Sequence, residues 1–490
     1  GAIAIDNFGY HYFEDHMDML GLTNIRFPGG TVSESGFVVD GRIRMGVGDV
    51  SLEKLDGDRS NFAFDLTHPE LISPLALEYD DSHHLLRDDV GTFSQALSFA
   101  VENSVTLGLI IPVQRYFKGA DLSDPEVREI AETAARSDIN VFLQRLSDGD
   151  YNEGIYPQSI TFEIGNEAYD NPIEYALIAK VMIEEISQQL AGSDIDYEIA
   201  FQMGRGEEEF YNLLNSGYFD PFFDRSIEMV SGLDGLEFSP NTGQVGLDPQ
   251  TAIDEIMSAI LDQSLQHIDA VRHHLLRFDL DDMENSGAPF LERDSIVDFW
   301  MDEFESVGID PDGIDYYISA WTTDSSNGTS TPYELSAAAN ILGIFAHFMD
   351  IGVDRAAIWG VTASFRYYED MHTTVVSDRL SDFVSPSGAI LQLMTQNVMA
   401  SDFLGSEGGL EDGYRSYLFE DETSYTAFYS VDALNGEDFE LTINLGLFRD
   451  LASVEIVNLD VEDGSAGGAS RLTNSEFVVE DGAVTLHFDQ

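Results

Sequence analysis

The chain contains no cysteine among its 490 residues, which excludes disulfide bonds, thiolate metal ligands and a cysteine nucleophile. Lysine is almost as scarce, because Lys54, Lys118 and Lys180 are the only three among 23 basic residues. No apolar run approaches the length of a membrane span, so we expect no membrane insertion. No signal peptide is visible at Gly1, and we expect that any targeting segment has been removed or never existed.

Positive charge is also scarce, since 90 acidic residues face 23 basic ones and give a formal net charge of −67. Such a surface repels nucleic acid and anionic membranes, so we expect neither as a partner. One interpretation is a solvated acidic coat suited to high salt, and the other is calcium binding. Asp279–Glu284 begins like an EF-hand loop but lacks glycine at its sixth position. We therefore favour the coat, leave structural calcium open, and expect a secreted bacterial protein of a saline environment.

Strand-like and helix-like segments alternate from the start of the chain to about residue 362, and 43% of the residues are hydrophobic. Strands are predicted at residues 2–5, 22–27, 105–113, 160–167, 197–203, 268–275, 314–321 and 355–361. Helices are predicted at residues 9–20, 124–146, 171–190, 253–265, 295–307 and 332–349. This alternation predicts an α/β fold with a parallel sheet closed into a (β/α)8 TIM barrel.

The pattern changes after about residue 404, where short strands replace the alternation. They are predicted at residues 414–420, 424–431, 439–445, 453–459 and 477–488, and Asp481-Gly482 is a hairpin signal. A C-terminal all-β sandwich domain is therefore predicted, with residues 1–403 as the barrel domain and residues 404–490 as the sandwich.

The segment from Ile160 to Glu167 carries the strongest signal for chemistry. Its first five residues suit a strand covered on both faces, and it ends in Gly165-Asn166-Glu167. The carboxyl end of a barrel strand is where such barrels place catalytic groups. A carboxyl group held partly in an apolar wall can have a raised pKa and act as a general acid. The alternative is that Asn166 and Glu167 only cap the next helix.

Four motifs resemble those of the clan A glycoside hydrolases, most closely the α-L-arabinofuranosidase and heparanase-like β-glucuronidase families. They lie in the expected order at Ile25–Gly30, Glu163–Glu167, Ile318–Trp321 and Ala357–Gly360, on the second, fourth, seventh and eighth barrel strands. The resemblance implies a retaining glycosidase that degrades a polysaccharide or oligosaccharide and requires no cofactor. It implies nothing about the oligomeric state.

The resemblance assigns the acid/base role to Glu167 and the nucleophile to position 320, where this chain has Ala320. Alanine has no nucleophilic chemistry, and three interpretations compete. The first, which we favour, is an inactivating Glu-to-Ala substitution, and the second is a natural carbohydrate-binding pseudoenzyme. The third is misalignment, with Asp324 or Asp315 as the nucleophile. We rank it last because Asp324 lies beyond the strand and Asp315 lies near its start, away from the catalytic face.

Side chains near Glu167 and position 320 are candidates for binding the substrate. The resemblance implies that Asn166 bonds the sugar hydroxyl beside the reacting carbon. Period-two alternation turns Glu163 into the barrel, where a lone charge is costly. Arg26 on the second strand is its expected partner, or else Arg26 orients the group at position 320.

His274 corresponds to a histidine of the family's His-x-Tyr motif on the sixth strand, but Leu276 replaces the tyrosine. Trp321 and Trp359 fall near strand ends, where they could stack on sugar rings or simply pack in the core. The chain has eleven histidines but no third ligand at metal spacing, so we expect no zinc site.

Arginines near the predicted strand ends suggest an anionic sugar such as a uronate, bound by bidentate contacts. These residues are Arg26, Arg115, Arg272 and Arg366. The alternatives are that they are structural partners of acidic loops, and that the enzyme is an arabinofuranosidase acting on neutral substrates.

Overall fold

The computed structural model describes part of the chain. The described residues are 2–4, 21, 23–27, 34, 36–39, 42–45, 66, 92–117, 120–166, 168, 171–204, 252–278, 288–323, 335–359, 386–409, 413–431, 439–448, 453–461, 470–474, 477–480 and 482–488. The helix predicted at residues 9–20 and the acidic segment 279–284 lie outside these ranges.

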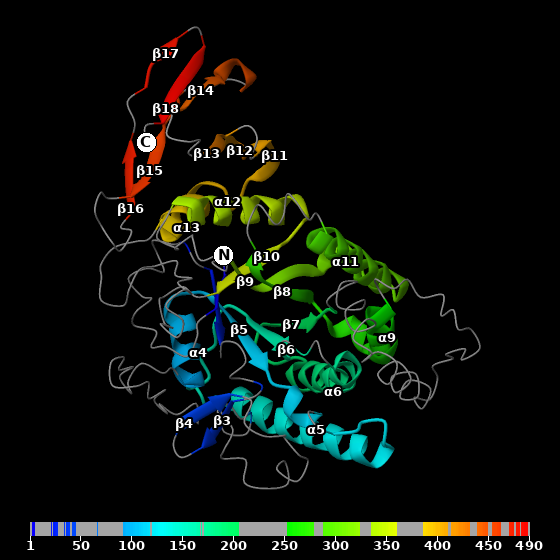
Figure 1. Ribbon diagram of the computed structural model, residues 1–490. Coiled ribbons are helices and arrows are strands. Elements are labelled where there is room, and N and C mark those ends of the chain that lie inside the picture. The colour runs from blue at the N-terminus through cyan, green and yellow to red at the C-terminus, as the bar shows by residue number, and fades with distance from the viewer. Residues whose placement is uncertain are drawn as a thin grey trace, which may run out of the picture.

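Eight parallel strands close into a barrel, which confirms the predicted fold class (Figure 1). They are β1 (Ala2–Ala4), β2 (Asn24–Phe27), β5 (Thr106–Ile111), β6 (Ile160–Ile164), β7 (Tyr197–Gln202), β8 (Ala270–Phe278), β9 (Asp315–Thr323) and β10 (Arg355–Trp359). Each strand pairs with the next in the chain, and β1 pairs with both β2 and β10 to close the ring. The carboxyl ends of all eight strands therefore meet at one mouth.

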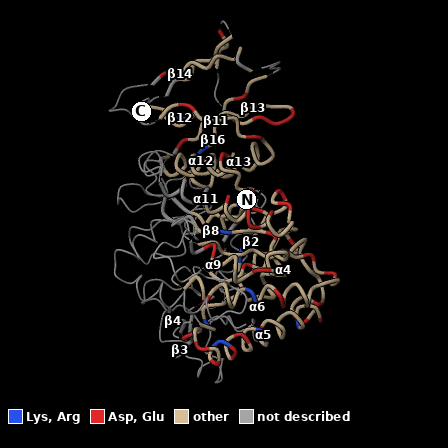
Figure 2. Tube along the Cα trace, turned by 90° about the vertical axis from the view of Figure 1, so that its right-hand side faces the viewer, with Lys and Arg blue, Asp and Glu red and all other residues tan. Residues whose placement is uncertain are grey.

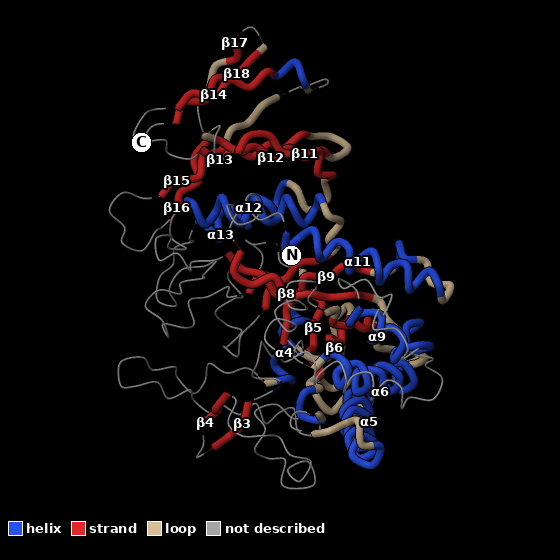
Figure 3. The backbone as a smooth tube through the Cα atoms, turned by 45° about the vertical axis from the view of Figure 1, so that its right-hand side comes forward, coloured by secondary structure: helices blue, strands red, loops and turns tan. Residues whose placement is uncertain are grey.

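Helices cover the outside of the barrel (Figure 3). They are α4 (Phe93–Glu102), α5 (Pro125–Ser147), α6 (Pro172–Leu190), α9 (Ala252–Leu261), α11 (Ala288–Ser306) and α12 (Leu335–Asp350), with short 3-10 turns at Gln114–Tyr116, Asp262–His267 and Pro311–Gly313. Helix α4, which starts with a capping box between Thr92 and Gln95, was not predicted from the sequence. The antiparallel hairpin of β3 (Gly36–Val39) and β4 (Arg42–Met45) was not predicted either.

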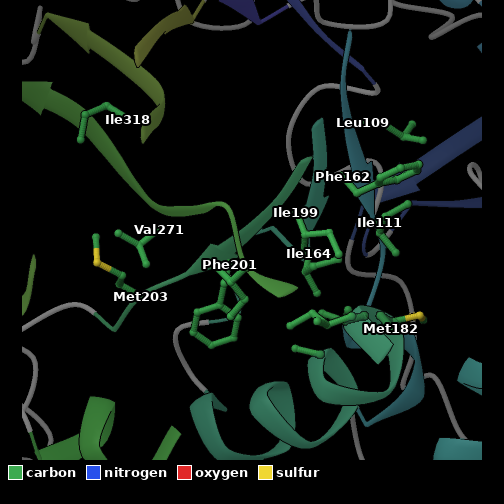
Figure 4. Close-up of a cluster of buried hydrophobic side chains, with 14 of the residues drawn as sticks. Leu109, Ile111, Phe162, Ile164, Met182, Ile199, Phe201, Met203, Val271 and Ile318 are labelled. Atoms are coloured by element: carbon green, nitrogen blue, oxygen red, sulfur yellow. The ribbon is translucent and has the colours of Figure 1, made fainter. Parts of the chain in front are cut away.

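Alternate residues of the barrel strands point outward into the layer between sheet and helices. Figure 4 shows side chains of this layer, among them Phe162 and Ile164 of β6, Phe201 of β7 and Met182 of α6. All four side chains are fully buried. Burying each large apolar side chain contributes about 1.5–3 kcal/mol relative to leaving it in water. The inward positions are thereby left for other residues, many of them polar.

The C-terminal region is all-β, as predicted, and it follows α13 (Pro386–Asn397). One sheet contains β11 (Asp402–Gly409), β12 (Tyr414–Glu420) and β13 (Tyr425–Val431), a second β14 (Phe439–Asn444), β18 (Ala483–Phe488) and β17 (Val479–Glu480), and a third β15 (Val457–Val461) and β16 (Ser470–Asn474). Phe419 of β12 packs on Phe345 of α12, with ring centroids 6.3 Å apart. The first sheet thus covers the outer face of α12.

Acidic residues occur along much of the described chain, whereas basic residues are few (Figure 2). No helix in the described ranges combines the length and apolar character that a membrane span requires. The described residues also contain no group of three or more histidine or carboxylate side chains placed to hold a metal ion. The two metal expectations, no zinc and an open question on calcium, remain predictions.

Candidate functional site

A polar cluster fills the barrel interior just below its mouth. Glu163 of β6 points inward and is fully buried, and its Oε2 accepts a hydrogen bond from Arg26 Nε at 2.8 Å. The predicted Arg26–Glu163 ion pair is therefore confirmed. Gly108 of β5 makes room for it, because a Cβ atom there would lie 2.9 Å from Glu163 Oε1.

Two further groups complete the surroundings of Glu163. Tyr317 of β9 donates its hydroxyl to Glu163 Oε1 at 3.1 Å. Burial, and then the neighbouring carboxylate, raise the pKa of Tyr317 well above its ordinary value, so this hydroxyl stays a neutral donor. Arg272 Nη1 lies 3.8 Å from Glu163 Oε2. Among the described residues, two guanidinium groups thus face one carboxylate here.

Arg272 of β8 also holds the carboxyl end of β6. Its Nη2 donates to the carbonyl oxygens of Ile164, at 2.9 Å, and Gly165, and its Nη1 donates to Ser319 Oγ at 3.2 Å. The side chain is fully buried. These internal bonds favour the structural role for Arg272 over direct contact with an anionic sugar.

His274 lies between the two arginines. Its Nε2 is 3.3 Å from Arg26 Nη2 and 3.5 Å from Arg272 Nη1. Guanidinium groups only donate, so Nε2 must be the acceptor, and a neutral ring then carries its proton on Nδ1. The histidine that the sequence singled out thus belongs to the same cluster. Only the backbone of Leu276 is described.

A left-handed glycine turns the chain out of β6. Gly165 has φ +73°, and a Cβ atom there would lie 2.8 Å from Val113 Cγ2 and 2.9 Å from Tyr175 Cε2. The Tyr175 hydroxyl in turn donates to the Ile164 carbonyl at 2.9 Å. Only glycine meets both requirements, and the turn aims Asn166 across the barrel mouth.

Asn166 is buried and held by three of its four polar groups. Its N–H donates to Glu34 Oε1 at 2.8 Å, its carbonyl accepts from Gln114 Nε2 at 2.7 Å, and its Oδ1 accepts from Arg26 Nη2 at 3.0 Å. Within the described part of the chain its Nδ2 has no partner. Asn166 does not cap α6, whose N-cap residue is Asn171. Glu167 follows directly in the chain and lies outside the described residues.

Glu34 is a site residue that the sequence analysis missed. Its buried carboxyl accepts hydrogen bonds from the backbone N–H groups of Val113, Gln114 and Asn166. Burial raises its pKa to about 7, against the opposing effect of these N–H groups and of the Arg115 charge. Arg115, also buried, therefore acts on Glu34 from the turn that follows β5.

A β-bulge places Ala320 at the other side of the site. His273 pairs with Ile318, but His274 pairs with Ala320, so β9 carries one extra residue at this point. The same shift appears against β10, where Ala356 pairs with Ile318 and Ile358 with Trp321. Ala320 is buried and lies beside His274. Bulges of this kind re-aim side chains next to active sites.

The remaining candidates lie apart from this cluster or cannot be placed. Trp321 packs in the core, with its ring 5.3 Å from that of Phe348 on α12, rather than presenting a face to the mouth. Trp359 ends β10, and its side chain is not described. Arg366 and Asp324 lie outside the described residues. Asp315 starts β9 and pairs with Arg355 Nε at 2.8 Å, at the end of the barrel opposite the mouth.

The sequence matches no protein-family model and none of the curated proteins. Solved structures with the same fold include a family 51 α-L-arabinofuranosidase from Bifidobacterium longum, with TM-score 0.51 and 12% identity over 100% of this chain and 94% of that one. A family 39 glycoside hydrolase from Bacteroides cellulosilyticus WH2 has TM-score 0.52 and 10% identity over 100% and 78%. An α-L-arabinofuranosidase from Thermotoga maritima has TM-score 0.50 and 11% identity over 100% and 92%. At this identity the likeness concerns the fold, and at that level it confirms the resemblance predicted from the motifs.

Proposed function

We propose that this chain has the scaffold of a retaining glycoside hydrolase and binds a carbohydrate at the barrel mouth. The observation that carries the proposal is the state of Asn166. Three of its polar groups are fixed inside the protein, while the buried Nδ2 donor has no partner among the described residues. A buried donor without an acceptor is costly unless a ligand satisfies it, and a sugar hydroxyl would do so.

The proposed chemistry depends on two positions, Glu167 next to Asn166 in the chain and position 320 on β9. Glu167, one residue further on, would protonate the leaving oxygen and then act as base for the attacking water. A carboxylate at position 320 would form the glycosyl-enzyme bond, and the retaining mechanism requires it about 5–5.5 Å from the Glu167 carboxyl. The cluster of Arg26 and Arg272 would favour the ionised form of that carboxylate. No cofactor is needed for either step.

Ala320 cannot perform the covalent step of this mechanism, because alanine has no nucleophilic group. We therefore propose that the present chain binds its sugar without completing hydrolysis, and that a Glu-to-Ala change separates it from an active parent. The second candidate, a natural carbohydrate-binding pseudoenzyme, is also consistent with Ala320. The two differ in whether the rest of the machinery still works once a carboxylate is restored.

The arginines bear on the substrate class. Arg26 and Arg272 are bonded inside the barrel, so recognition of a uronate would fall to Arg115 and Arg366. Two of the solved structures with this fold are named as α-L-arabinofuranosidases. We propose a neutral arabinose-containing oligosaccharide ahead of a uronate.

We also propose that the acidic surface adapts a secreted protein to a saline medium.

Calorimetric titration of the unaltered chain tests the proposal, because bound sugar is not consumed. Arabino-oligosaccharides should bind, and Asn166→Ala should weaken binding about 10-fold or more, the usual effect of losing one good hydrogen bond to a ligand. Ser98→Ala, which removes a side-chain hydrogen bond on α4 at a distance from the cluster, is the control. Tighter binding of uronates than of arabino-oligosaccharides at low salt would favour an anionic substrate instead. The absence of binding by any sugar would overturn the proposed function.

A further inference from the structure

Glu34 ties together the ends of two strands to which it does not belong. Its Oε2 accepts from Val113 N–H at 2.9 Å and Gln114 N–H at 2.8 Å, just past the end of β5. Its Oε1 accepts from Asn166 N–H at 2.8 Å, just past the end of β6, and also lies 3.2 Å from Val113 N. One carboxylate thus satisfies three backbone donors at the barrel mouth.

These contacts form a closed ring of three residues. Glu34 accepts from the backbone N–H groups of Gln114 and Asn166, and the Gln114 side chain donates to the Asn166 carbonyl at 2.7 Å. Both backbone polar groups of Asn166 are therefore fixed within the ring. Because the backbone of Asn166 leads directly into Glu167, the ring also fixes where the chain starts toward that residue.

The ring needs an ionised Glu34. A carboxylate accepts hydrogen bonds on both oxygens, but a protonated carboxyl turns one oxygen into a donor. Since Oε1 serves Asn166 and Oε2 serves Gln114, protonation on either oxygen weakens one of these two bonds. Burial raises the pKa of Glu34 to about 7, so this change falls near neutral pH.

Several charged groups act on the ring from the packed elements. Arg115 in the turn after β5 is the charge that acts most strongly on Glu34 and favours its ionised form. Arg26 on β2 donates to Asn166 Oδ1. Arg26 also contacts Glu163 on β6 and His274 on β8, and Arg272 on β8 faces Glu163.

We propose that Glu34 is a positioning residue that holds Asn166 in its sugar-binding orientation, so that binding weakens when Glu34 takes up a proton. The binding half of this inference rests on the proposed function. The positioning of Asn166 by Glu34 does not rest on it, because these contacts exist whether or not a sugar binds. Two measurements separate these halves.

The first measurement is amide hydrogen exchange, followed by mass spectrometry of peptides covering residues 111–117 and 163–168. In Glu34→Gln the amide oxygen can serve only one side of the ring, so either Gln114 or Asn166 loses its acceptor. Protection of that amide should fall about 10-fold or more. Asp254→Asn is the matched control, since Asp254 is a second buried carboxyl whose Oδ1 alone accepts from Gly204 N–H and Trp300 Nε1. An asparagine there keeps both bonds, so protection at Gln114 and Asn166 should not change.

The second measurement is calorimetric binding of 4-nitrophenyl α-L-arabinofuranoside to the unaltered chain from pH 5.5 to 8.5. The dissociation constant should rise about 10-fold as pH falls through about 7, and Glu34→Gln should show the weak-binding value at every pH. Unchanged protection in Glu34→Gln, or the same pH dependence in the variant as in the unaltered chain, overturns the proposal. If exchange responds as expected but the sugar binds at no pH, the proposed function is overturned while the hold on Asn166 is supported.

Discussion

Ala320 of β9 is the register partner of His274 of β8, and one extra residue in β9 separates this pair from the preceding one. His274 is in contact with both Arg26 and Arg272. A side chain longer than alanine at position 320 would therefore project toward a pair of guanidinium groups. A carboxylate at position 320 would therefore lie near two cations, whereas this chain has alanine there.

Introducing a carboxylate at position 320 should produce the hydrolytic activity proposed above. We expect Ala320→Glu to hydrolyse an arabinose- or uronate-containing substrate about 10³-fold or more faster than the unaltered chain, because it supplies the group that forms the covalent intermediate. Release of reducing ends from a panel of polysaccharides measures this. Ala320→Gln has the same size without the charge and should remain inactive. If Ala320→Glu releases no reducing ends from any substrate, the pseudoenzyme is favoured.

Breaking the buried ion pair should be costly. Arg26→Met leaves Glu163 with a more distant cation, Arg272 at 3.8 Å, and removes a donor from Asn166. We expect a loss of about 3–5 kcal/mol in the free energy of unfolding, measured by chemical denaturation. Arg145→Met, which breaks a more exposed pair with Asp150, should cost only about 0–1 kcal/mol. Equal losses in the two variants would show that the buried Arg26–Glu163 pair contributes no more to stability than the exposed pair does.

Gly165 should resist substitution more than a glycine with the same backbone in open space. Gly192 has φ +75° and nothing within 4 Å of an added Cβ atom, whereas an added Cβ at Gly165 would meet Val113 and Tyr175 below 3.0 Å. Gly192→Ala should lose about 1–2 kcal/mol from backbone strain alone. Gly165→Ala should lose about 1–3 kcal/mol more. A thermal unfolding comparison of the two variants isolates the packing contribution, and equal losses would refute it.

The raised pKa of Glu34 predicts a pH dependence of stability with a definite sign. Its pKa is about 7 in the folded protein against 4.5 as the ordinary value, so the folded state retains a proton that the unfolded state releases. This contribution to stability is complete below pH 4.5 and is lost as pH rises to about 7, by about 3 kcal/mol in total. Asp254, with a pKa raised to about 6, acts in the same direction.

The corresponding measurement compares the unfolding free energy at pH 5 and pH 8 in high salt, which suppresses repulsion among the surface carboxylates. Glu34→Gln should reduce the loss between these pH values. A loss of the same size in the variant would mean that Glu34 does not titrate in this range.

Much of this fold can be predicted from the sequence because apolar strand-like segments alternate regularly with helix-like ones. The period-two pattern of β6 correctly predicted that Glu163 points into the barrel, where Arg26 was its expected partner. Two missed elements did carry local signals, namely Asp40-Gly41 between β3 and β4 and the Thr92–Gln95 capping box of α4. Glu34 carried none. Its partners are backbone N–H groups from two distant strands, and nothing local distinguishes it from the other acidic residues among the 90.

Helix α12 contacts both the barrel and the C-terminal region through apolar side chains. This helix packs on the barrel through the ring contact of Phe348 with Trp321, and on the first C-terminal sheet through Phe345 and Phe419. A barrel cut before β11 would leave Phe345 facing water along with its neighbours on α12. Such a fragment would associate through that exposed face. The C-terminal sheets therefore also cover part of the barrel, and a barrel produced without them would require polar replacements on α12.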